Sequence, residues 1–190
     1  VDLQHEYLNT INSIQQNFAN IIIDTTSLVN SNTFFPLLKN KDVVLFPRQE
    51  TGASYISAVS NSIRTFVSSG GNAIILGMNF HTNIGSNPII YSSGLFSGSD
   101  TADVSSGNST VMDTTDWFVK NVNPIFTNPT TTYLQKITDL NKKNIVSSFG
   151  KDVVTFKKYG NGNATYIGYD YNLITSDIQK ILANAIEFAY

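Results

Sequence analysis

One stretch of the sequence has the form in which α/β enzymes present a nucleophile: an apolar strand that ends at a glycine and turns into polar residues. The apolar run at 73–76 is followed by Gly77-Met78-Asn79. A nucleophile at such a turn is exposed above the sheet, where a base can reach it. None of these three residues is a nucleophile, and the chain contains no cysteine. The sequence therefore predicts a turn of catalytic shape without the atom that would form a covalent bond.

Polar side chains with acid–base chemistry follow this strand and the strand predicted before it. His81 lies just past the turn, where open α/β sheets place ligands, and Glu50 follows the strand predicted at 42–47. Glu50 could orient His81, and Asn79 could donate to an oxyanion. A general base also needs a nucleophile within hydrogen-bond reach, and nothing in the sequence supplies one beside His81. We therefore favour ordinary polar roles for Asn79 and His81.

Two more residues are predicted at the same edge of the sheet. Arg48 could clamp a carboxylate or phosphate through two hydrogen bonds, or it could pair with Glu50 at the surface. Asp170 follows a strand predicted at 164–167 and could point into the same crevice. The predicted ligand-binding residues are Arg48, Glu50, Asn79, His81 and Asp170. The alternative interpretation is a hydrolase that uses Glu50, His81 and Asp170.

No metal or cofactor is expected. Asp100, Asp103, Asp113 and Asp116 carry the oxygen ligands that calcium prefers, but their spacing matches no calcium loop, so we interpret them as solvated turn acids. Zinc is not expected, because the chain has two histidines far apart in the sequence and no thiol. The glycines at 160 and 162 lie between two predicted strands, which favours a turn over a phosphate-binding loop.

The elements that position these residues alternate between strand and helix. Apolar side chains at helical spacing predict helices at 1–18, 54–69 and 176–189. Short apolar runs predict buried strands at 21–23, 42–47 and 73–76, and a hairpin is predicted at 153–167. This order predicts an α/β protein with a three-layer, flavodoxin-like open sheet that is mostly parallel, with a C-terminal β-hairpin and a final helix. Residues 83–116, rich in Ser, Gly and Asn, are predicted to form a polar insertion.

Composition excludes several classes of protein. The 190 residues are 41% hydrophobic and 14% charged, with a net charge of −2. Lys and Arg are scattered rather than clustered, which argues against nucleic-acid binding, and no apolar run is long enough to span a membrane. Neutral polar residues replace charge on the surface, from which we expect an extracellular or cell-surface protein. Tyr91, Tyr133, Tyr169 and Tyr171 could stack on sugars if they form an exposed row.

Three stretches together resemble the class I glutamine amidotransferase-like superfamily, which includes ThuA-like proteins and the trimerisation domain of some β-galactosidases. They are the strand at 42–47, the helix end and strand at 66–77, and the hairpin at 159–170. Members with amidotransferase activity carry a cysteine after the strand that matches 73–76. The resemblance therefore implies a degenerate member that lacks the catalytic cysteine.

From these observations we expect a single domain over 1–190, within a larger protein and with neighbouring domains as partners. The expected function is a non-catalytic binding or assembly module of an exported or cell-surface protein. Its ligand would be a glycan, a small molecule or a protein, bound at the carboxyl ends of the strands. The hydrolase described above and a spacer without any ligand are the alternatives.

Overall fold

The computed structural model describes residues 5–26, 31–47, 54–77 and 89–188. The elements in chain order are α1 (Glu6–Asn17), α2 (Ser31–Leu38), β1 (Val43–Phe46), α3 (Ser54–Ser68), β2 (Asn72–Leu76), α4 (Ile89–Ser92), β3 (Gly98–Val104), β4 (Gly107–Val111), the 3₁₀ helix η1 (Trp117–Val119), β5 (Ile125–Asn128), β6 (Thr132–Ile137), β7 (Lys142–Ser148), β8 (Lys151–Tyr159), β9 (Gly162–Ile167) and α5 (Ser176–Glu187).

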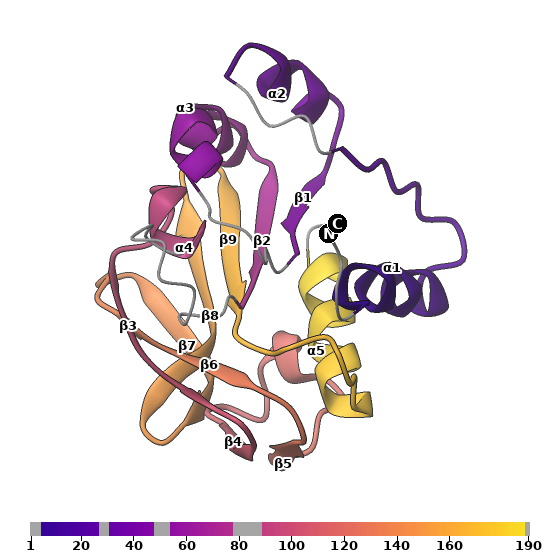
Figure 1. The fold of residues 1–190 in the computed structure, drawn as a ribbon, viewed down its shortest axis with the longest axis vertical. Helices are drawn as coiled ribbons and strands as arrows, with labels where there is room; N and C mark the ends of the chain where they lie inside the picture. Colours follow the sequence, from indigo (N-terminus) through magenta and orange to yellow (C-terminus); the bar gives the residue numbers. More distant parts are fainter. Residues whose placement is uncertain (1–4, 27–30, 48–53, 78–88, 189–190) are drawn as a thin grey trace.

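The nine strands form one mixed sheet (Figure 1). Its main path runs β1-β2-β9-β8-β7-β4-β5, and β6, which pairs with β8, carries β3 as its other neighbour. Only β1–β2 and β2–β9 are parallel pairs. Every other pair of these strands is antiparallel.

The prediction of a mostly parallel, three-layer flavodoxin-like sheet is therefore wrong. Parallel strands need a long crossover, usually through a helix. After β2, short turns join β7 to β8 and β8 to β9 as antiparallel neighbours, and the other antiparallel pairs, β3–β6, β4–β5, β4–β7 and β6–β8, form between strands that no short turn connects. The described part of the predicted polar insertion contributes α4, β3 and β4, and both strands belong to the main sheet. The predicted alternation of strand and helix is therefore present in β1, α3 and β2 but does not continue along the rest of the chain.

Helices cover both faces of the parallel part of the sheet. Side chains of β2 alternate between two hydrophobic clusters: Ile74 and Leu76 pack in one, Ala73 and Ile75 in the other. The first cluster is covered by α5 and α1, and the second by α3, α4 and α2 (Figure 1). Apolar side chains therefore point in both directions from β2, and all five of its residues are buried.

The predicted C-terminal hairpin is present as β8 and β9. Its turn closes between Tyr159 and Gly162 and packs on the end of α3, where the Asn161 N–H donates to the Ser68 carbonyl at 3.0 Å. Gly160 adopts φ 63°, and a Cβ there would lie 2.6 Å from Ser68 Cα. The glycine is required both by the left-handed backbone and by this close approach.

Two N-terminal predictions need correction. The β-branched run at 21–23 belongs to no helix or strand, and Ile22 is 87% exposed. The first helix is present, but Glu6, Thr10, Ser13 and Ile14 form its buried face, and Tyr7 is on the surface. The buried face of this helix is therefore mostly polar, and Ile14 is its one buried hydrophobic residue.

None of the described helices combines the length and the apolar composition that crossing a membrane requires.

Two tyrosines after β9 are buried in the hydrophobic cluster that α1 and α5 cover. Tyr169 and Tyr171 are 0% and 1% exposed. The Tyr169 hydroxyl donates to Ser109 Oγ at 2.8 Å, whereas the Tyr171 hydroxyl has no hydrogen-bond partner within the described structure. Burial raises the pKa of both phenols far above the usual value, because a phenolate cannot be solvated there.

This burial predicts a loss of stability at alkaline pH. Above about pH 10 the unfolded chain releases the phenolic protons while the folded chain retains them, so each tyrosine lowers the free energy of unfolding by about 1.4 kcal/mol per pH unit. Tyr171→Phe should remove the contribution of one tyrosine from this slope. The free energy of unfolding at pH 7 should stay unchanged or rise, because the substitution removes no hydrogen bond. Tyr169→Phe should flatten the decline equally but lower stability at pH 7. Urea unfolding between pH 7 and 11.5 measures the free energy of unfolding of both variants against pH. An unchanged slope in Tyr171→Phe would show that this phenol is not buried in its protonated form.

Candidate functional site

The chain leaves β1, β2 and β9 at the same edge of the sheet, because these three strands are parallel. This is the edge at which open α/β sheets bind ligands. The stretches that follow β1 and β2 contain Arg48, Glu50, Asn79 and His81, and all four lie outside the described residues. Their predicted roles stay predictions. Asp170, which follows β9, is the one predicted site residue that the structure places.

The contacts of Asp170 hold the backbone at this edge. Its side chain is 5% exposed, and Oδ1 accepts a hydrogen bond from the Asn172 N–H at 2.8 Å. Its backbone N–H donates to the Thr131 carbonyl at 3.0 Å, and its carbonyl accepts from Thr130 Oγ1 at 3.3 Å. Asp170 therefore ties the turn after β9 to the segment that leads into β6.

The predicted nucleophile turn begins under an aromatic ring. Tyr133, at the start of β6, is 1% exposed, and a Cβ added to Gly77 would lie 2.2 Å from its Cδ2. A Cβ at Gly168 would lie 2.4 Å from the Tyr133 carbonyl oxygen. Glycine is thus required at the ends of β2 and β9 so that Tyr133 can pack on bare backbone. Gly77 is explained by this packing rather than by an exposed catalytic turn.

Hydrogen bonds fix Tyr133 in this position. Its N–H donates to the Gly168 carbonyl at 2.7 Å, and the Tyr166 hydroxyl donates to its carbonyl at 3.0 Å. Just before it, the fully buried Asn128 donates from Nδ2 to the carbonyls of Thr130 and Thr131, at 2.9 and 3.0 Å. The sequence analysis missed both Tyr133 and Asn128 as parts of this edge, because their contacts join segments far apart in the chain.

The four tyrosines that could have stacked on sugars do not form an exposed row. Tyr133, Tyr169 and Tyr171 are buried, and Tyr91 is half-buried with its hydroxyl donating to Gln135 Oε1 at 2.6 Å. Their rings fill the cores and the strand ends, so they offer no flat exposed surface for a sugar.

Of the four acidic residues interpreted as turn acids, Asp113 and Asp116 lie in turns, whereas Asp100 and Asp103 lie in the strand β3, so that interpretation is wrong for the latter two. Asp113 accepts from the N–H and the hydroxyl of Thr115, which lower the pKa of its exposed carboxyl. Asp116 accepts from the Phe118 N–H at the start of η1 and pairs with Lys143. Within the described ranges, no group of three histidine, cysteine, aspartate or glutamate residues could hold a metal ion.

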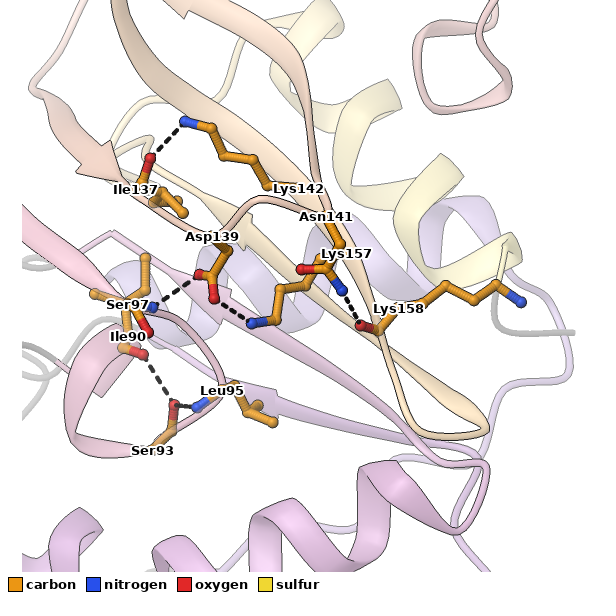
Figure 2. Close-up of polar contacts among 10 residues, drawn as sticks. All are labelled: Ile90, Ser93, Leu95, Ser97, Ile137, Asp139, Asn141, Lys142, Lys157 and Lys158. Atoms are coloured by element: carbon orange, nitrogen blue, oxygen red, sulfur yellow. Dashed lines mark hydrogen bonds and ion pairs between the residues drawn. The ribbon is translucent and has the colours of Figure 1, made fainter.

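A buried charge cluster lies between the β6–β7 turn and the loop before β3 (Figure 2). Lys157 Nζ lies 2.7 Å from Asp139 Oδ1, with side chains only 7% and 13% exposed. Asp139 Oδ2 also accepts from the Ser97 N–H at 2.8 Å, and the Lys157 ammonium lies 5.4 Å from the centroid of the Phe96 ring. Lys157 is a charged residue at an inward-facing position of an apolar strand. This pattern indicates a buried ion pair, which the sequence analysis missed. The cluster fastens the loop that enters β3 to the central strand β8.

Removing one partner of this ion pair should be costly. Asp139→Ala leaves the Lys157 ammonium buried without its carboxylate, so we expect a loss of about 3 kcal/mol in the free energy of unfolding. Asp139→Ala with Lys157→Met should recover part of that loss, because no unpaired charge remains. Urea denaturation, followed by circular dichroism, measures the free energy of unfolding of the parent, the single variant and the double variant. A loss below about 0.5 kcal/mol in the single variant would show that the pair is solvated.

The Gly77–Tyr133 contact gives a second prediction. Gly77→Ala places a methyl group against a ring that is fixed on both sides, which should cost about 1–3 kcal/mol. In a Tyr133→Ala background the same change should cost much less, because the ring is gone. If the cost of Gly77→Ala is the same in both backgrounds, the two residues do not pack on each other.

No family model matches the sequence, and no curated protein matches it. Solved structures do match in fold. A putative ThuA-like protein from Bacteroides uniformis aligns over 100% of this chain and 86% of its own, with a TM-score of 0.73 and 12% identity. A cytoplasmic protein from Salmonella typhimurium LT2 aligns over 95% of this chain and 85% of its own, with a TM-score of 0.71 and 9% identity. The chain therefore has the fold of ThuA-like proteins, which is a class I glutamine amidotransferase-like fold.

The fold also occurs as a part of larger enzymes. A β-galactosidase from Bacillus circulans aligns over 77% of this chain but only 22% of its own length, with a TM-score of 0.51 and 15% identity. The expectation of an extracellular or cell-surface location is corrected by the comparison, because a similar structure is described as a cytoplasmic protein. A surface rich in neutral polar residues does not identify an exported protein.

Proposed function

We propose that this domain is a non-catalytic binding or assembly module, a degenerate amidotransferase-like domain. Its ligand, a glycan or another small molecule, would bind at the carboxyl ends of β1, β2 and β9. The observation that carries the proposal is the packing of Tyr133 on Gly77. The first residue of the predicted nucleophile turn, Gly77, is covered by the buried Tyr133 ring, and the chain contains no cysteine.

The described chemistry at this edge supports binding better than catalysis. Asp170 is buried and accepts a backbone N–H, so its carboxylate already serves the turn. The well-held backbone around Asn128 and Tyr133 would give loops at this edge a rigid base, which is the usual arrangement for binding sites.

The comparisons support a modular role. The β-galactosidase match covers less than a quarter of that enzyme, so a domain of this fold can be built into a larger chain. A partnership with neighbouring domains is the corresponding proposal for this protein.

A hydrolase is the second candidate function. It is favoured by the shared position of Glu50, His81 and Asp170, which follow the carboxyl ends of three adjacent parallel strands. It would require a nucleophile, such as a water molecule, to be activated between these residues.

One experiment separates the two functions. Thermal shift is measured against a panel of neutral and acidic monosaccharides and small carboxylates, and hydrolysis is measured with p-nitrophenyl esters, p-nitrophenyl glycosides and glutamine. We expect a ligand-dependent rise in Tm that the double variant Glu50→Gln/His81→Ala abolishes, with no turnover in either protein. The matched control, Glu187→Gln/His5→Asn, changes the same residue types outside the site and should behave as the parent.

Two outcomes would contradict the proposal. Turnover that is lost in Glu50→Gln/His81→Ala but retained in the control would establish the hydrolase. A complete absence of ligand-dependent shifts across the panel would favour a spacer.

A further inference from the structure

A cleft of about 710 Å³, which we call the amino-end cleft, lies where β1 and β2 begin. Its lining comes from the end of α2 with the turn into β1, within 35–42, and from the end of α3 with the turn into β2, within 66–72. Every lining residue belongs to the described ranges. Figure 1 shows α2 and α3 at this end of the sheet. The volume is typical of small-molecule sites. Asp170 lies at the opposite end of the parallel strands, so the inference does not rest on the proposed function.

The wall that α2 contributes is apolar and only partly covered. Phe35, Pro36 and Leu37 are three consecutive exposed residues, and the first two line the cleft. Phe35 is 48% exposed, whereas Leu38 and Phe66, which complete the apolar lining, are 5% and 8% exposed. A run of exposed apolar side chains on a short surface helix is unfavourable in water unless a ligand or partner covers it.

The floor of the cleft is backbone that hydrogen bonds hold in place. The N–H groups of Gly70 and Gly71 donate to carbonyls in the last turn of α3 at 3.0 and 3.1 Å. A Cβ at Gly71 would lie 2.3 Å from the Phe66 ring, whereas a Cβ at Gly70 would meet nothing within 4 Å. The Asn72 N–H donates to the Asp42 carbonyl at 2.9 Å and so ties the two walls together. The shape is therefore preformed, which lowers the entropic cost of binding.

Two charges of opposite sign line the cleft without a partner. Lys39 and Asp42 are exposed, and within the described structure neither forms an ion pair, with the other or with any third residue. The remaining charged residue of the lining, Lys41, is paired with Asp24. The carboxyl ends of α2 and α3 also border the cleft, and a helix carboxyl end favours a positive group. The cleft therefore has a partner for one negative and one positive group beside an apolar surface.

We propose that the amino-end cleft binds a free amino acid with an aromatic side chain. At neutral pH such a molecule carries a carboxylate, an ammonium group and an apolar ring. The carboxylate pairs with Lys39, the ammonium pairs with Asp42, and the ring packs against Phe35 and Phe66. A ligand with the carboxylate alone brings a like charge to Asp42, and a ligand with the amine alone brings a like charge to Lys39. The two unpaired charges therefore select the zwitterion.

The test is a titration of the whole domain at pH 7, followed by the NMR chemical shifts of its backbone amides. The ligands are L-phenylalanine, 3-phenylpropionate, which lacks the ammonium, phenethylamine, which lacks the carboxylate, and L-alanine, which lacks the ring. Phenylalanine should shift the amides of Gly70, Gly71 and Asn72. It should bind about threefold more tightly than each of the other three, as expected for one exposed ion pair or a partly buried ring.

Two variants assign the charged groups. Lys39→Gln should remove the preference for phenylalanine over phenethylamine and keep the preference over 3-phenylpropionate. Asp42→Asn should do the reverse. Both side chains are exposed, so both variants should fold as the parent does. Lys136→Gln is the matched control, because it changes an exposed lysine of β6 outside the cleft, and it should keep both preferences.

Three results would overturn the proposal. The first is an absence of shifts at the cleft up to the solubility limit of phenylalanine. The second is equal affinity for phenylalanine, 3-phenylpropionate and phenethylamine, which would mean that Lys39 and Asp42 do not contact the ligand. The third is a set of shifts confined to the carboxyl ends of the strands, which would place the amino acid at the other edge of the sheet.

Discussion

The packing of one aromatic ring on bare backbone determines how the two parts of this sheet meet. Tyr133 begins β6 in the antiparallel region, and it lies on Gly77 and Gly168 at the ends of two parallel strands. The ring excludes any side chain at position 77, and the hydrogen bonds around it fix the segment from Asn128 to Tyr133. The strand end therefore has a structural requirement for glycine, and no side chain fits at position 77.

Buried polar groups carry much of the specificity elsewhere in the fold. The Lys157–Asp139 pair orders the loop into β3, and at the opposite end of the parallel strands Asn163 donates to Asn72 Oδ1 at 2.6 Å. Such groups are costly to bury unless they are satisfied, so each of them admits few alternative arrangements. These contacts connect residues widely separated in the chain, which is consistent with a sheet whose central strands come last in the sequence.

The sequence predicted elements well where apolar periodicity is strong. β1, α3, β2, the β8–β9 hairpin and the final helix lie where their patterns placed them. β4 and β5 were missed because their alternation is carried by residues such as Ser109 and Asn128, which are buried although they are polar. The apolar run at 21–23 was predicted as a strand, but strand formation also needs a partner edge, which a local pattern cannot reveal. At the site, the position of Asp170 was predictable from the strand before it, whereas the contact between Gly77 and Tyr133 spans more than fifty residues.

The central claim is that Tyr133 closes the end of β2, and NMR can observe that contact directly. The account predicts strong nuclear Overhauser effects between the Tyr133 ring protons and the Gly77 Hα protons, together with a ring that a soluble paramagnetic agent does not reach. If those effects are absent and the ring is accessible to the agent, the strand end is open. The explanation for the glycine at position 77 would then be wrong.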